Sequence, residues 1–580
     1  MMAWRSWFGI RETVVLVLFL AVLLLPLLFE VDHPEGDSSK RTLVIMTPHN
    51  EQIRYEFKRA FEIWHLEQHG EAVNVAWSVP GGTSEIRRML MAQWTAALEQ
   101  GVQPGGDADL VFGGGSYEHG RLRQGVSKAL RDRSPAQVQQ WLDGVGVSDA
   151  GAIMDAAKAD QRASFGADDV RGTLYAPVDG QAWRIEASAT ISTPAHLVDD
   201  PAALYGRAEV ADTPLWNKDG YWWGTALSSF GIIANRDELK RRGLEVPDSW
   251  RDLADPKLIK AVSMVNPAQS GSVTTAFETI LRRYGWTPGW QVLRRMAANA
   301  RTISASSLRG PTDVASGDAA MGVCIDFFGR YQEQALADHG SAGRVVYVDP
   351  PGETMLDPDP ISMLANPPDR VLAERFMVFT LSDQGQSLLQ FDPYAQSPDG
   401  LGPHQYALRR LPIVAHMYSQ FDKRFMDRFD PFASAQGFEY PDHAMRAFIA
   451  PLMQAMAFDR RDELEDAWRA ITSHPNFPMD TEGVVVTADM VSDPALKAML
   501  EHFDAMPEVT SPNGEVLSLN TADGRSAVKS GWLRGGWGDR GPWHVESAPS
   551  SAFRRFAGRF FEAQYGQVVS GAQTVTASSP

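Results

Sequence analysis

The chain has 580 residues, 44% of them hydrophobic, so it is long enough for more than one domain with its own core. Asp and Glu number 72 against 54 Lys and Arg, and the net charge of −18 argues against a general nucleic-acid or anionic-membrane surface. The single cysteine, Cys324, excludes an intrachain disulfide and a zinc site built from cysteines.

Residues 1–40 predict a membrane anchor and a polar tether. Arg5 and Arg11 precede an uncharged run from Thr13 to Phe29, and acidic residues follow it, which is the charge pattern of a span whose positive end stays in the cytoplasm. The run is short for a bilayer-spanning helix and long for a signal-peptide core, so a cleaved signal stays open. We favour a single-pass anchor in the cytoplasmic membrane, with the bulk of the chain periplasmic.

From residue 41 the chain alternates short apolar segments with amphipathic ones, which is typical of α/β folds with mostly parallel sheets. Strands are predicted at 43–46, 73–79 and 110–112, each leading to a polar or Gly-rich loop. In such folds ligands bind beyond the carboxyl ends of the strands, so these loops should converge on one rim. The candidate ligand contacts from this first part of the chain are His49, Asn50, Gly114, Ser116 and Trp183.

Residues 120–220 fit this pattern less well and are interpreted as an insertion. Helices are predicted there around 135–142 and 149–158, and strands at 174–178 and 182–185. The segment from Tyr221 to Ile233 is predicted to cross into a second lobe, and the chain is predicted to return near Val345 to Val348. Two such crossings would form a hinge.

The most informative segment runs from Asn266 to Tyr331. A small polar turn, 266–272, leads into a predicted helix starting near Ser272, whose apolar residues recur at helical spacing. The free N–H groups and positive dipole end of that helix can hold an anion or a carboxylate, although its serines could equally be plain turn and cap residues. The candidate contacts from this lobe are Ser270, Gly271, Ser272, Ser304, Ser306, Ser307, Asp326, Phe328 and Tyr331.

Four motifs carry a family resemblance: 43–50 (LVIMTPHN), 223–233 (WGTALSSFGII), 266–272 (NPAQSGS) and 381–386 (LSDQGQ). In this order they resemble the family-1 extracellular solute-binding proteins of ABC-type importers, especially the ferric-iron-binding branch. The resemblance covers roughly residues 41–395. It implies a type II periplasmic-binding-protein-like clamshell whose lobe 1 is 41–225 plus 345–397 and whose lobe 2 is 226–344. Such a protein captures a small solute without a cofactor and delivers it to an ABC permease.

One departure from the ferric-binding branch changes the expected cargo. Ferric-binding members carry adjacent tyrosines where this chain has Phe327 and Phe328, and phenylalanine offers no oxygen to a hard ferric ion. An organic or oxoanion solute therefore ranks above iron. A remodelled ferric site would have to use His49, Asp326 and Tyr331.

Other functional patterns are weak. The chain lacks the common hydrolase, nucleotide-binding and zinc-protease motifs, so we expect a non-catalytic protein. His65 and His69, one helical turn apart, are more simply solvated than zinc-binding. Asp357 and Asp359 alternate with prolines, which favours a rigid loop over an acid/base pair.

The resemblance ends near residue 397. Residues 398–565 predict a mostly helical C-terminal extension of unknown role, with its clearest helix at 442–471, and the Gly/Ser/Thr-rich residues 566–580 predict a disordered tail. Two other functions stay open. A membrane-tethered solute sensor would share every feature of the cleft, and an extracellular hydrolase is the least favoured.

Overall fold

The computed structural model describes residues 40–100, 105–124, 162–166, 171–175, 184–188, 200–395, 399–434, 436–437, 440, 442, 444–481, 483–535, 537 and 549–578. The predicted anchor at 13–29, the predicted helices at 135–142 and 149–158, and Trp183 lie outside these residues. None of the helices within the described ranges is long and apolar enough to cross a membrane.

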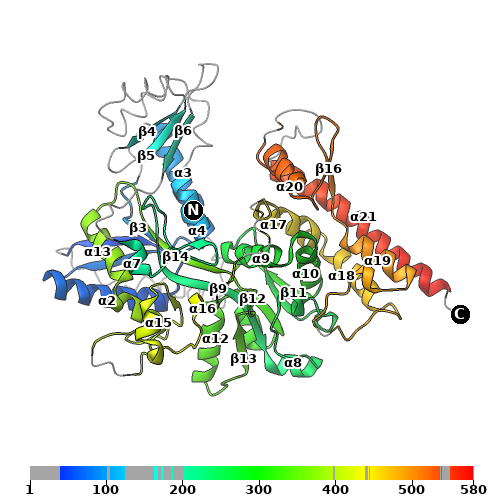
Figure 1. The fold of residues 1–580 in the computed structure, drawn as a ribbon, viewed down its shortest axis with the longest axis horizontal. Helices are drawn as coiled ribbons and strands as arrows, with labels where there is room; N and C mark the ends of the chain where they lie inside the picture. The colour runs from blue at the N-terminus through cyan, green and yellow to red at the C-terminus, as the bar shows by residue number, and fades with distance from the viewer. Residues whose placement is uncertain are drawn as a thin grey trace, which may run out of the picture.

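A ten-stranded sheet runs through the described part of the chain in the order β11-β10-β12-β9-β14-β3-β1-β2, and β13 and β15 also pair with β9 (Figure 1). The strands of lobe 1 are β1 (Thr42–Met46), β2 (Asn74–Ser78) and β3 (Leu110–Phe112). Those of lobe 2 are β10 (Val262–Val265), β11 (Ala300–Ser304) and β12 (Met321–Ile325). Within each lobe these strands pair in parallel, as the alternating pattern predicted.

Two long strands join the lobes. β9 (Trp223–Asn235) and β14 (Leu356–Met363) are buried along their whole length and pair with each other antiparallel. β14 pairs with β3 in lobe 1 and β9 pairs with β12 in lobe 2, so the two strands form the hinge. The crossing predicted at β9 is therefore present.

The predicted return near 345–348 needs correction. Those residues form β13 (Val345–Val348), which pairs with the lobe 2 end of β9, and the chain returns later, through β14. The segment 357–360, expected to be a loop, is part of β14. Its register shifts between Asp359 and Pro360, which is an irregularity of the kind that lets a strand accommodate prolines.

Helices cover both lobes. Lobe 1 carries α2 (Glu51–His69), α3 (Thr83–Gln100), α4 (Ser116–Gln124), α13 (Arg370–Leu381) and α14 (Asp383–Gln390). Lobe 2 carries α8 (Arg236–Arg242), α9 (Gly271–Tyr284), α10 (Trp286–Ala298), α11 (Arg309–Ser316) and α12 (Asp326–Asp338). α2 begins after Asn50, whose side chain accepts a hydrogen bond from the Ile53 amide, and ends at Gly70, which has a left-handed backbone conformation.

A small three-stranded sheet stands in the insertion. It consists of β4 (Arg162–Gly166), β5 (Arg171–Tyr175) and β6 (Arg184–Ser188). The strands predicted at 174–178 and 182–185 overlap β5 and β6 only in part.

The C-terminal region consists of two segments, one packed on each lobe. Residues 399–434 pack on lobe 1: β15 (Leu411–Pro412) pairs with β9, and Met417 and Phe425 belong to the lobe 1 core. Buried residues of the described segments between Met445 and Val568 belong to the lobe 2 core instead. The helices of this second part are α17 (Arg446–Met453), α18 (Arg461–Thr472), α19 (Pro494–Asp504), α20 (Ala522–Val528) and α21 (Pro549–Ser578), and α18, α19 and α21 lie on the side of lobe 2 away from lobe 1 (Figure 1).

Two predictions for this region are corrected. The helix expected at 442–471 is divided, because α17 continues as a π-helical turn to Phe458 and the chain bends before α18. Residues 566–578, expected to be disordered, complete α21. Phe561, Tyr565 and Val568 are fully buried on one face of that helix, an apolar spacing that the small residues around it conceal in the sequence.

Candidate functional site

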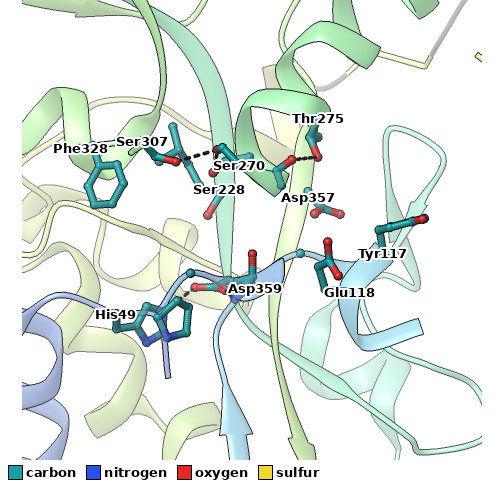
Figure 2. A pocket seen from close by; sticks show the side chains of 18 of the residues that line it. His49, Tyr117, Glu118, Ser228, Ser270, Thr275, Ser307, Phe328, Asp357 and Asp359 are labelled. Atoms are coloured by element: carbon teal, nitrogen blue, oxygen red, sulfur yellow. Dashed lines mark hydrogen bonds and ion pairs between the residues drawn. The ribbon is translucent and has the colours of Figure 1, made fainter. Parts of the chain in front are cut away.

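A cavity of about 450 Å³ lies between the two lobes, at the carboxyl ends of their strands (Figure 2). Lobe 1 contributes the loops after β1, β2 and β3, and lobe 2 contributes the start of α9, the turn after β11 and the junction of β12 with α12. Ser228 and Phe230 of β9 and residues 357–359 of β14 complete the lining from the hinge. The predicted convergence of loops on one rim therefore occurs in both lobes.

The lobe 2 wall is built around the start of α9. Ser270 is the N-cap: its Oγ accepts a hydrogen bond from the Val273 amide at 3.2 Å and lies 2.7 Å from Ser307 Oγ. That contact ties the two Ser-rich turns together. Ser272 Oγ lies 3.5 Å from Ser270 Oγ. The wall thus presents hydroxyl groups beside the positive dipole end of a 14-residue helix.

The opposite wall holds a buried ion-pair cluster on β14. Asp359 Oδ2 lies 2.9 Å from His49 Nε2 and pairs with Arg410, while its Oδ1 accepts the Gly114 amide at 2.5 Å. Although burial opposes ionisation, the charge of Arg410 and the hydrogen bond with His49 hold the pKa of Asp359 well below its usual range. Burial lowers the pKa of His49 despite the neighbouring carboxylate. Asp359 is therefore an ionised group whose charge is neutralised by Arg410 within the protein.

Asp357, two residues earlier on β14, has a different environment. Its side chain accepts hydrogen bonds from Ser116 Oγ at 2.7 Å and from the Ser116 amide at 3.3 Å. No described residue forms an ion pair with it, and burial raises its pKa to about 6. Nearby, Glu118 pairs with Arg87 and accepts from Ser84 Oγ at 3.1 Å. Among the described residues, Asp357 is consequently the buried carboxylate of this wall without an ion-pair partner, although the charge of Arg446 is close enough to favour its ionised form.

Arg446, the first residue of α17, reaches the cavity from the C-terminal region. Its Nη1 lies 2.5 Å from Glu278 Oε2 and 3.2 Å from Thr275 Oγ1, both on α9. Its guanidinium carbon stands 4.3 Å from the centre of the Tyr117 ring, which belongs to lobe 1. A residue far outside the predicted two-lobed body therefore contributes to the lining and contacts both lobes.

The structure brings many of the predicted contacts together, but not all. Those that line the cavity are His49, Gly114, Ser270, Gly271, Ser272, Ser306, Ser307 and Phe328. The predicted contacts outside it are Asn50, Ser116, Ser304, Asp326 and Tyr331.

Each residue outside the lining has another environment. Asn50 caps α2, Ser116 holds Asp357 from behind, and the Ser304 hydroxyl accepts from the Ser306 amide within its own turn. Asp326 is fully buried, because the first turn of α12 points it into the interior, and Tyr331 is 39% exposed on the outer face of that helix.

Lining residues that the sequence did not indicate as contacts include Thr83, Tyr117, Glu118, Ser228, Thr275, Asp357, Asp359 and Arg446. The sequence could have indicated Asp357 and Asp359, since carboxylates between prolines are unusual in a buried strand. Nothing in the sequence indicated Arg446, because it comes from a helix 171 residues beyond Thr275.

The residues considered for metal binding are not assembled. His49 lines the cavity, whereas Asp326 and Tyr331 do not, so the remodelled ferric site is not formed by these three. In the described ranges, no group of three or more His, Cys, Asp or Glu could hold a metal ion. His65, expected to be solvated, is buried, with its Nδ1 2.8 Å from the Glu71 carbonyl oxygen.

Part of the chain matches a known family. Residues 199–405 match a family model described as bacterial extracellular solute-binding protein. The phosphoglycerate transport regulatory protein PgtC of Salmonella typhimurium is 30% identical over 164 residues, which is 28% of this chain and 39% of that protein. The chain thus spans about two fifths of the length of this curated relative.

Solved structures resemble the chain at low identity. The periplasmic binding protein AfuA from Actinobacillus pleuropneumoniae, with fructose-6-phosphate bound, is 16% identical with a TM-score of 0.44, covering 74% of this chain and 98% of that one. Iron-bound HitA from Pseudomonas aeruginosa is 14% identical with a TM-score of 0.40, covering 68% and 92%.

Proposed function

We propose, from the match of residues 199–405 to the bacterial extracellular solute-binding proteins, that the chain captures a small solute between its two lobes and passes it to a membrane partner. Three of the four motifs that predicted this family, at 223–233, 266–272 and 381–386, lie within the matched residues, which supports the proposal. Proteins of this family bind solutes outside the cytoplasm and do not transform them.

The observation that carries the proposal is a cavity lined from both lobes above the two hinge strands. Because β9 and β14 are the strands that link the lobes, small changes in them would move one wall against the other. A solute that contacts both walls stabilises the closed arrangement by its differential affinity for it. Its ligand contacts would be the predicted residues that line the cavity, together with Thr83, Thr275 and Arg446.

The solute we favour carries an anionic group. The start of α9 offers backbone amides, a dipole end and two serine hydroxyls on the cavity side, which suits a carboxylate or an oxoanion. Iron ranks lower, because Phe327 and Phe328 line the cavity without an oxygen and the alternative ligand set is dispersed.

For delivery we propose an ABC permease as the partner, with the segment 13–29 holding the protein at the cytoplasmic membrane. A membrane-tethered sensor is the second candidate, because the relative PgtC is named a transport regulatory protein. Uptake of the identified solute by cells lacking this protein separates the two. Lost uptake supports a transporter component, while normal uptake with lost transcriptional response supports a sensor.

Thermal melting tests solute capture itself. The panel contains ferric ion, oxoanions, phosphonates, sugar phosphates, polyamines and small carboxylates. A ligand at about a hundred times its dissociation constant adds roughly 2.7 kcal/mol to the stability of the folded state. Ser272→Phe should fill the cavity and abolish the shift, whereas Ser473→Phe, at an exposed position beyond α18, should preserve it. A shift that survives Ser272→Phe would contradict binding at this cavity.

A further inference from the structure

The two walls of the cavity differ in electrical character. The lobe 2 wall presents the start of α9 and the guanidinium of Arg446, which are both positive. The facing wall presents the carboxylates of Glu118, Asp357 and Asp359 (Figure 2). The two walls therefore carry groups of opposite formal charge.

Most of these charges are already neutralised within the protein. Glu118 pairs with Arg87, Asp359 pairs with Arg410, and Arg446 pairs with Glu278. Of the buried carboxylates that line the cavity in the described part of the chain, Asp357 has no ion-pair partner there. It is 5% exposed and its described partners are hydrogen-bond donors of Ser116. A buried carboxylate without a cation is costly, and a ligand that supplies the cation removes that cost.

We propose that the cavity takes a zwitterionic solute, with its cationic nitrogen against Asp357 and its anionic group against the start of α9 and Arg446. This inference rests on the proposed function and adds the chemical class of the solute. The remaining lining suits an uncharged body, because Phe230, Phe327 and Phe328 form an apolar side. A cavity of about 450 Å³ accommodates a molecule of metabolite size.

The role of Asp357 also predicts how binding depends on pH. Burial raises its pKa to about 6 in the protein without solute, and Arg446 opposes that shift by favouring the ionised form. A bound ammonium group would favour the ionised form further. Affinity for such a solute should therefore fall as the pH decreases below about 6, because the carboxyl must first release its proton.

Matched probes test the class of solute on the full chain by titration calorimetry. O-phosphoserine and 3-phosphoglycerate differ only in an ammonium group against a hydroxyl, and so do 2-aminoethylphosphonate and 2-hydroxyethylphosphonate. We expect the amine of at least one pair to bind ten-fold or more tightly than its hydroxyl partner. Asp357→Asn should reduce that preference to less than three-fold, while Asp462→Asn, on the surface of α18, should leave it unchanged.

Arg446→Gln tests the contact with the anionic group of the solute separately from the contact with its ammonium group. It should weaken both members of a pair by a similar factor, because it acts on their common anionic group, and Arg469→Gln, with a side chain that is 52% exposed, is its control. Hydroxyl partners that bind as tightly as the amines would overturn the inference. The inference would also be overturned if a solute from the melting panel bound while neither O-phosphoserine nor 2-aminoethylphosphonate did. In that case the proposal of solute capture would still stand. A failure of every solute in both series to bind would overturn both proposals.

Discussion

Asp326, a predicted ligand contact that does not line the cavity, provides a prediction about the stability of the protein. Its carboxyl is fully buried under the cavity, and burial raises its pKa to about 7 although Arg330 and Arg410 favour the charged form. In the unfolded chain the pKa returns to about 3.8. Between these values the folded protein holds a proton that the unfolded chain releases, so the free energy of unfolding falls as the pH rises from about 4 to about 7.

The size of this effect follows from the difference of about three pKa units. Each unit corresponds to about 1.4 kcal/mol, so ionisation of Asp326 costs the folded state roughly 4 kcal/mol across the window. Asp326→Asn keeps the shape and cannot ionise. Relative to the wild type, the variant should gain about 1 kcal/mol of stability per pH unit between pH 5 and 7, because the full slope of about 1.4 kcal/mol per unit halves where the pH reaches the pKa.

Urea denaturation at half-unit steps of pH, followed by tryptophan fluorescence, measures the difference between the two proteins. Other titrating groups contribute equally to both and cancel in the difference. Asp318→Asn serves as a control, because Asp318 is an exposed carboxylate of the same lobe. A difference between Asp326→Asn and the wild type that stays constant from pH 5 to 7 would refute the reasoning.

Three further changes test other parts of the structure. Arg410→Met leaves the Asp359 carboxylate buried with His49 and the Gly114 amide as its partners but without a permanent cation, and we expect a loss of about 3–5 kcal/mol in urea denaturation; a loss below 1 kcal/mol would argue against the buried pair. Gly113 has a φ of 99° and an added Cβ would stand 2.6 Å from the His49 ring, so Gly113→Ala should cost about 1–3 kcal/mol, and an unchanged melting temperature would contradict that packing. Ending the chain after residue 434 removes helices that share the lobe 2 core, so the product should bind a hydrophobic dye strongly, whereas a monomeric product without dye binding would show that lobe 2 does not need this covering.

Local sequence patterns predicted the parts of the site that depend on local chemistry. The polar turn before a helical repeat of apolar residues located the start of α9, and Ser270 does cap it. The residues that cap α2, Asn50 and Gly70, are likewise of the types that favour helix ends. In each case a side chain or a glycine satisfies backbone groups within a few residues of itself, so the information lies in one short segment.

Tertiary contacts decided the rest. Asp357 looked like part of a loop, because prolines lack the N–H that a strand normally uses, and only the pairing of β14 with β9 shows that it crosses the hinge. The first turn of α12 buries Asp326, which no periodicity could indicate. Arg446 enters the site through the packing of α17 against α9, an association between segments far apart in the chain.

Capture between the lobes is tested most directly by amide hydrogen exchange with and without a solute identified by melting. Simultaneous binding to both walls predicts slower exchange at 79–85 of lobe 1 and at 270–275 of lobe 2, together with the hinge residues of β14. Protection confined to one lobe, or protection on a surface away from the cavity, would contradict capture between two closing lobes.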